Sequence, residues 1–219
     1  MKAVLEELTT SEVAVATATS IQKVSRTIDE KILPSGLYSA KGTRTFRRDA
    51  CVLIAFYFET ANSLTAPARL RVIRNAVAHC PTWEDLRECA VAEGPVTVQF
   101  AATWDAVNDR LKKLKKAREM VVADPQILSG TPVFKGTRVP VYDIAAAVNS
   151  GASKETILAS YPSLKAWQVE LAPLYAKAVP ARGRPRRPSL PRGVAITVKK
   201  RKLRSSSAQG GAGAEVSHR

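Results

Sequence analysis

The stretch Thr9–Leu33 reads TTSEVAVATATSIQKVSRTIDEKIL and determines the fold expected for the N-terminal part of the chain. Thr9 and Glu12 have the spacing of a capping box, so we expect a first helix to begin near Thr10. Ser20 is a residue type that often caps a helix, and a second helix is predicted from there to the end of the stretch. The buried stripe of this second helix is predicted to consist of Ile21, Val24, Ile28 and Leu33.

The two predicted helices are joined by a short turn, as in a helix-turn-helix. Gln22, Lys23 and Arg26 lie outside the predicted buried stripe, in the half of the second helix that reaches base edges in that motif. Gln and Arg side chains can form paired hydrogen bonds with bases, and Lys can neutralise a phosphate. A hairpin predicted at Leu37–Phe46, with Lys41–Gly42 at its tip, would form a basic wing. The residues expected to contact DNA are Ser20, Gln22, Lys23, Arg26, Lys41, Arg44, Arg47 and Arg48.

This order of elements, followed by an Arg-Arg-Asp helix start at Arg47–Asp49, resembles the winged-helix head of MerR-class regulators. MerR proteins usually carry an aromatic pair after the recognition helix, and the chain has Thr27–Glu30 (TIDE) there. The resemblance therefore extends to the architecture and not to the effector chemistry of that class. The alternative interpretation is a small helical packing module with a solvated polar face.

Residues 81–120 are expected to connect this head to the rest of the chain. The pattern predicts a short helix capped by Thr82, a strand at Val96–Phe100 and a long helix capped by Thr103. The buried seam of the long helix is predicted to be Trp104, Val107, Leu111 and Leu114. A solvated face that complements the helix dipole and a phosphate-contacting face both explain the lysines near its end, which are Lys112, Lys113, Lys115 and Lys116.

The stretch Asp124–Val141 reads DPQILSGTPVFKGTRVPV and predicts a sharply turning hairpin. Its glycines allow positive φ at both ends of a short strand, and its prolines remove donors at the edges. Arg138 is expected to tie the hairpin to Asp124 or Asp143 through a charge-assisted bond. The residues expected to shape this hairpin are Asp124, Gly130, Pro132, Gly136, Arg138 and Pro140.

From Asp124 to Leu164 the chain resembles the bacterial domain of unknown function 433, in which D-P-x-I-x-x-G-x-P-V-x-x-G-T-R-[VI]-P precedes a Y-P-x-L turn. Proteins that place this domain behind an N-terminal helix-turn-helix resemble VapB-type antitoxins. The resemblance implies a type II toxin–antitoxin pair, in which this chain neutralises a PIN-domain ribonuclease toxin and represses its own promoter.

The last 39 residues hold 11 Lys/Arg against 1 Asp/Glu and carry most of the net charge of +15. This composition predicts disorder and a polyanionic partner. Arg182–Pro185 (RGRP) matches the core of an AT-hook, which reads a narrow minor groove; a generic basic linker and contact with an acidic partner are the alternatives. The tail residues expected to contact nucleic acid or toxin are Arg182, Arg184, Arg186, Arg187, Lys199, Lys200, Arg201, Lys202 and Arg204.

Several classes of protein are not expected. The histidines, His79 and His218, form no catalytic constellation, and no glycine loop fits a phosphate, so we expect no enzyme, no metal and no cofactor. The apolar run Cys51–Phe58 is too short for a bilayer, which needs about 20 residues, and the N-terminus is not a secretory signal. The cysteine spacings match no disulfide framework, which predicts buried free thiols in the cytoplasm for Cys51, Cys80 and Cys89.

The sequence thus predicts a mainly α fold with short β-hairpins. The expected parts are a winged helix-turn-helix at 1–80, a connecting helix-strand-helix segment at 81–120, a hairpin with three helices at 121–180, and a disordered basic tail at 181–219. A homodimer is expected on double-stranded DNA, because single heads bind weakly. The alternatives are a stand-alone regulator or nucleoid-associated protein without a toxin, and a pure protein-interaction module.

Overall fold

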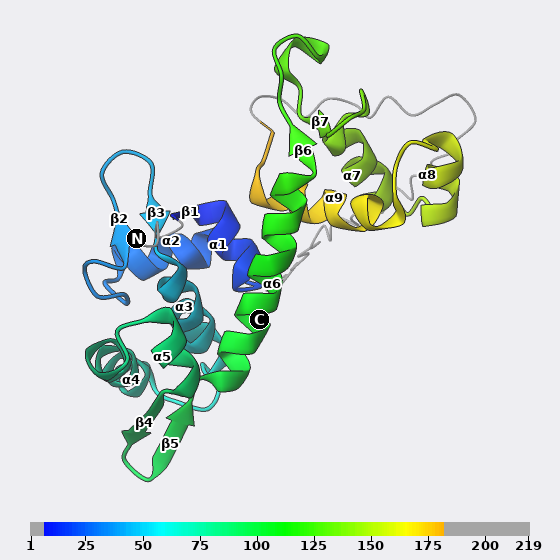
Figure 1. Cartoon of the computed structure of the whole chain (residues 1–219). Helices are drawn as coiled ribbons and strands as arrows, with labels where there is room; N and C mark the ends of the chain where they lie inside the picture. The colour runs from blue at the N-terminus through cyan, green and yellow to red at the C-terminus, as the bar shows by residue number, and fades with distance from the viewer. Residues whose placement is uncertain (1–6, 182–219) are drawn as a thin grey trace, which may run out of the picture.

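The computed structural model describes residues 7–181, and this part of the chain is mainly helical with short antiparallel strands, as predicted (Figure 1). Its first elements are β1 (Leu8–Thr9), α1 (Thr10–Ala16), α2 (Ile21–Asp29), β2 (Tyr38–Ser39), β3 (Thr45–Phe46), α3 (Arg48–Glu59), α4 (Ala66–His79), α5 (Trp83–Glu88), β4 (Ala90–Glu93) and β5 (Val96–Gln99). They are followed by α6 (Ala101–Glu119), β6 (Val121–Val122), the 3-10 turn η1 (Leu128–Gly130), β7 (Val133–Phe134), α7 (Val141–Asn149), α8 (Lys154–Ser160) and α9 (Ala166–Ala178).

Local capping bonds explain where most helices begin. The Thr9 amide donates to the Glu12 carboxylate at 2.9 Å and closes the expected capping box of α1. The Ser20 hydroxyl accepts the Lys23 amide at 3.2 Å and caps α2. The predicted cap of the long helix was wrong, because α6 begins after the fully buried Phe100 and Thr103 lies inside it.

The end of α2 differs from the prediction. The helix ends at Asp29, because Lys31 adopts a left-handed backbone with φ of 54°. The Ile32 amide then donates to the Thr27 carbonyl at 2.9 Å, and this turn directs Ile32 and Leu33 into the core. Ile21 was wrongly placed in the buried stripe, since it is 45% exposed at the first turn of α2, where a groove opens.

Three small antiparallel sheets link the helices. The first has the strand order β1-β3-β2, with both Leu8 and Tyr38 paired to Phe46. It contains the predicted hairpin, and β1 is a strand that the sequence pattern did not indicate. The predicted strand β5 pairs with β4 around a turn that contains Gly94, and β6 pairs with β7.

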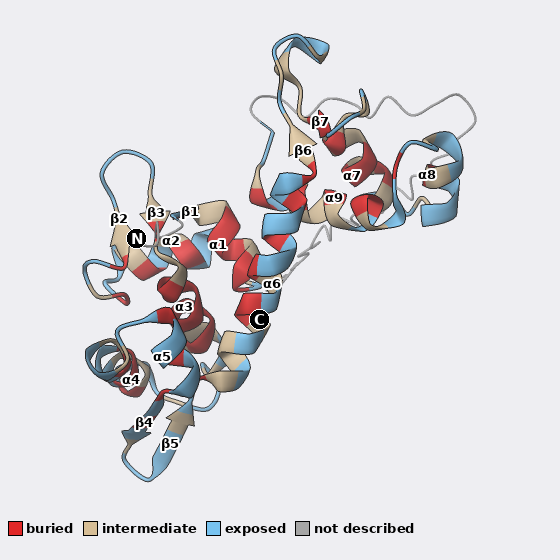
Figure 2. Cartoon of the chain, in the orientation of Figure 1, coloured by how far each residue is buried: buried red, intermediate tan, exposed pale blue. Residues whose placement is uncertain are grey.

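Two hydrophobic cores divide the described residues (Figure 2). The first includes side chains from α1 to α5 and continues along α6 to Leu114. The second joins Ala117 and Met120, at the end of α6, to Phe134, α7, α8 and α9. Residues 81–120 were expected to be a connection, yet Trp83 and Phe100 belong to the first core. Most of that segment therefore packs in the N-terminal unit, and the end of α6 joins it to the second core.

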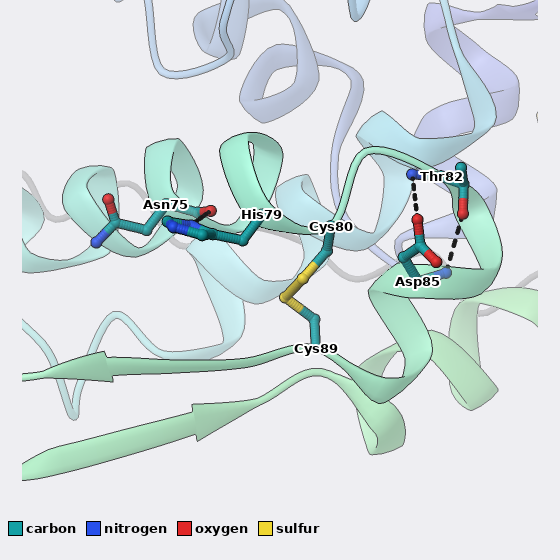
Figure 3. Close-up of a disulfide and its surroundings, with 6 residues drawn as sticks. All are labelled: Asn75, His79, Cys80, Thr82, Asp85 and Cys89. Atoms are coloured by element: carbon teal, nitrogen blue, oxygen red, sulfur yellow. Dashed lines mark hydrogen bonds between the residues drawn. A yellow bond between two sulfur atoms is a disulfide. The ribbon is translucent and has the colours of Figure 1, made fainter.

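A disulfide joins Cys80 and Cys89, with a Cα–Cα distance of 6.1 Å (Figure 3). The expectation of free thiols was therefore wrong for these two cysteines. The short helix α5 lies between them and brings its two flanking residues together, an arrangement that linear spacing does not reveal. Cys51 is free and buried as predicted, and burial raises the pKa of its thiol to about 12. Within residues 7–181, no helix is both long and apolar enough to cross a membrane.

Candidate nucleic-acid interface

The polar face of α2 is turned outward. Gln22, Lys23 and Arg26 are exposed, whereas Val24 and Thr27 are fully buried against the first core. The buried Thr27 hydroxyl donates a hydrogen bond to the Val24 carbonyl at 2.6 Å, so it has a partner inside the core. The period of the helix thus separates a packing face from a face with polar side chains available to a ligand.

Arg26 has a carboxylate partner on its own helix. Its Nε lies 2.8 Å from Glu30 Oε1 and its Nη2 lies 3.2 Å from Glu30 Oε2. The hydrogen bonds that Arg26 donates to Glu30 raise the pKa of Arg26, and both side chains remain exposed. An exposed pair of this kind contributes little to stability, because water screens it. The guanidinium can therefore exchange Glu30 for another acceptor at small cost.

The neighbours of Arg26 are less constrained. Lys23 places Nζ 5.3 Å from the ring centroid of Phe58, a weak contact for an exposed ammonium. The Gln22 side chain has no hydrogen-bond partner among residues 7–181. Its amide is therefore available to a base edge or to solvent.

The hairpin is fixed to α2 by an ion pair. Arg44 Nη2 donates to Asp29 Oδ1 at 2.9 Å, so β3 is held beside the C-terminal end of the helix. Lys41 is exposed at the tip, next to Gly42, whose φ of 73° makes the turn.

Arg47 and Arg48 are held by internal contacts, although both were expected to contact DNA. Arg47 is half-buried at the start of α3 and pairs with the buried Asp49. Arg48 donates to Asn108 Oδ1 at 2.7 Å, and its guanidinium lies 4.0 Å from the ring centroid of Trp83. The contacts of Arg48 hold α3 against α5 and α6, whereas the Arg47 pair lies at the start of α3.

The predicted C-terminal hairpin is only partly as expected. Gly130 and Gly136 have φ of 80°, which confirms the predicted turns. Pro132 accepts the Val141 amide at its carbonyl, and Pro140 forms an isolated bridge with Val133. Arg138 is exposed, and its expected bond to Asp124 or Asp143 stays a prediction. Asp124 accepts the Gln126 amide at 2.9 Å. The strand β7 pairs with β6, which precedes the motif.

The cations from Arg182 to Arg204 that were expected to contact nucleic acid or toxin lie outside the described residues, and so does the expected disorder after Ala181.

The fold brings three cations together near the start of α2: Arg110 and Lys113 of α6 and Lys177 of α9. From the sequence, Lys113 was expected on a helix for which a phosphate-contacting face was one alternative, and Arg110 and Lys177 were not singled out. The spacing of Arg110 and Lys113 places them on one helix face, which was readable. The approach of Lys177 depends on the packing of α9 against α1, for which the sequence carries no local signal.

The chain was compared with protein-family models, with curated proteins and with solved structures. The model of a protein of unknown function, DUF433, matches residues 121–176, which confirms the expected resemblance. The chain is 45% identical to the uncharacterized protein y4eO of Sinorhizobium fredii (strain NBRC 101917 / NGR234) over 193 residues, which cover 85% of this chain and 87% of y4eO. The crystal structure of Rv2018 from Mycobacterium tuberculosis is 18% identical and covers 75% of this chain and 95% of that chain, with a TM-score of 0.31. A TM-score of this size does not establish a shared overall fold.

Proposed function

The chain belongs to the same family as the Sinorhizobium fredii protein y4eO, and we propose that it is a sequence-specific DNA-binding protein that represses its own promoter. The observation that carries this proposal is the exposed face of α2, with Gln22 and Lys23 in its first turn and Arg26 one turn further along the same face. In a helix-turn-helix, the second helix lies in the major groove and its N-terminal residues contact base edges.

The neighbouring elements support a winged helix-turn-helix. The helices α1 and α2 are separated by residues 17–20 only, the hairpin of β2 and β3 follows them, and β1, which precedes α1, pairs with β3. The Arg44–Asp29 pair holds the hairpin next to α2, where Lys41 can reach a phosphate beside the base-reading helix. The role of this wing is to position the head, because phosphate contacts carry no base information.

We further propose that the protein acts as an antitoxin against a PIN-domain ribonuclease. The support is the combination of this head with a DUF433 region at 121–176, the organisation that resembles VapB-type antitoxins. A homodimer would place two α2 helices on paired half-sites, since dimers of such heads bind sites about one helical turn apart. In this proposal the C-terminal unit builds the dimer or docks the toxin.

DNA binding is tested by fluorescence anisotropy with a duplex from the region upstream of the coding sequence and a scrambled duplex. Replacing Arg26 or Gln22 by Ala should cost about 1–3 kcal/mol of discrimination between the two duplexes, or roughly 5- to 150-fold. Arg74 is a matched control, because it is exposed on α4, away from α2, and Arg74→Ala should preserve the discrimination. Equal affinity of the wild-type protein for both duplexes would refute specific recognition.

The antitoxin role is tested by co-expression with the product of the adjacent gene. Wild-type protein should restore growth to cells that produce a PIN-domain neighbour. Arg26→Ala should restore growth equally while it loses promoter binding, because the two activities use different surfaces. A specific DNA-binding protein that rescues no neighbour would instead be a stand-alone regulator or nucleoid-associated protein.

A further inference from the structure

A groove of about 750 Å³ separates the α1–α2 turn from α6 and α9. Its apolar lining includes Ala18, Ile21 and Leu174. The helix α1 packs against both α6 and α9, and the Ser11 hydroxyl donates to the Ala178 carbonyl at 2.7 Å. The sides of the groove are thus held together by direct contacts.

The charged residues of this groove are mostly cations. Arg110, Lys113 and Lys177 line it, and Glu170, the one acidic residue among its described lining, is bound to Lys154 at 2.7 Å. Nη1 of Arg110 is buried and has no hydrogen-bond partner among the described residues. Buried polar atoms are nearly always hydrogen-bonded, so an unpaired guanidinium nitrogen points to an absent acceptor. The groove has the charge for an anionic ligand.

The groove lysines differ from the arginines of α2 and the hairpin. Arg26 and Arg44 already have carboxylate partners at 2.8 Å and 2.9 Å. Within residues 7–181, neither Lys113 nor Lys177 has an ion pair or a side-chain hydrogen bond. Like the exposed Lys23 and Lys41, these lysines therefore have no carboxylate to release when they bind an anion.

The groove also adjoins the end of α2 that is proposed to read bases. Ser20 and Ile21 line it, and Gln22 and Lys23 follow directly along the chain. A helix that lies in the major groove is bordered by the sugar–phosphate strands of the duplex. We infer that this groove receives one such strand, whose phosphates contact Arg110, Lys113 and Lys177. The inference rests on the proposed function.

The apolar lining suits this occupant, because the deoxyribose rings between phosphates present C–H surface. An acidic protein segment with apolar side chains shares part of this chemistry. The groove is continuous with Ser20 and Ile21, which favours DNA as the occupant. A DNA strand in the groove and the bases contacted by Gln22 would belong to the same duplex.

The experiment measures how DNA affinity depends on salt. Each neutralised phosphate adds about −0.9 to the slope of log K against log salt concentration. The full-length variant with Lys113→Gln and Lys177→Gln should therefore bind with a slope about 1.8 shallower than wild type. The change should be equal on the promoter and scrambled duplexes, because phosphate contacts are independent of sequence. Thermal unfolding should be unchanged, since both lysines are exposed.

Lys112→Gln is the matched control. Lys112 lies on the same helix, but the helical repeat turns it away from Arg110 and Lys113, and its side chain is 68% exposed. Its slope should equal that of wild type. If the double variant also keeps the wild-type slope on a promoter that wild type binds specifically, this inference is wrong and the proposed function stands.

Two other outcomes are distinguishable. Absence of DNA binding by the wild-type protein would overturn the proposed function and this inference together. The double variant could instead keep the wild-type slope but no longer co-purify with the protein encoded by the adjacent gene. That result would mean that the groove binds an acidic protein segment, and it would refute the inference that a DNA strand occupies it.

Discussion

The ion pair between Glu12 and Arg118 gives a prediction about stability. The effect of replacing Glu12 should change sign when Arg118 is replaced as well. The Glu12 side chain is 2% exposed, and its Oε1 lies 3.0 Å from Arg118 Nη2. The carboxylate also accepts the Thr9 amide and hydroxyl at 2.9 Å and 3.0 Å. Glu12→Gln keeps an oxygen for Thr9 but loses the charge-assisted bond, so it should cost about 2 kcal/mol of unfolding free energy.

The reverse change should cost more. Arg118→Met leaves the Glu12 carboxylate buried without the Arg118 guanidinium. Breaking a buried pair in this way should cost about 3–5 kcal/mol of unfolding free energy. In that background, Glu12→Gln removes a poorly compensated buried charge and should raise stability instead of lowering it. The four proteins form a double-mutant cycle that urea unfolding can measure. Additive costs, with a coupling below about 0.5 kcal/mol, would refute the pair.

Three further predictions concern single positions. Cys80→Ser removes a disulfide between residues nine positions apart and should lower the unfolding free energy by about 2.5 kcal/mol in the loop-entropy model. Dithiothreitol should destabilise the wild-type protein by a similar amount and leave the variant unchanged. An equal response of both proteins would mean that the disulfide is absent. Gly136→Ala should lower the unfolding free energy by about 1 kcal/mol, because the φ of 80° at this position disfavours a side chain. Steric clash is not the cause, since no described atom lies within 4 Å of the new Cβ. An unchanged Tm in thermal unfolding would contradict this prediction. The pKa of Cys51 is raised to about 12, so its thiol is neutral at pH 8 and iodoacetamide should label it only after denaturation, as mass spectrometry can check; labelling in the folded protein would contradict its burial.

Local hydrogen bonding made much of the fold predictable. The capping bonds of Thr9 and Ser20 lie within three residues, so their helix starts could be read from the sequence. Gly130 and Gly136 were readable for the same reason, since their turns need positive φ. Features that depend on distant contacts were missed or misassigned.

Ile21 shows why the candidate site was only partly predictable. Its position in the helical period predicts burial, but α6 and α9 leave a groove over it. Arg47 and Arg48 were read as a basic wing, whereas Asp49, Asn108 and Trp83 hold them. A periodic pattern identifies which face of a helix is apolar, and it does not identify which distant element covers that face.

The participation of α6 in two cores has a mechanical consequence. Its 19 residues span about 28 Å as one rigid rod, and Leu114 and Ala117, on adjacent turns, are packed in different cores. A tilt imposed at one end must therefore displace the other. Because α6 is one continuous helix between the two cores, a ligand that tilts the C-terminal unit should also reorient the N-terminal head.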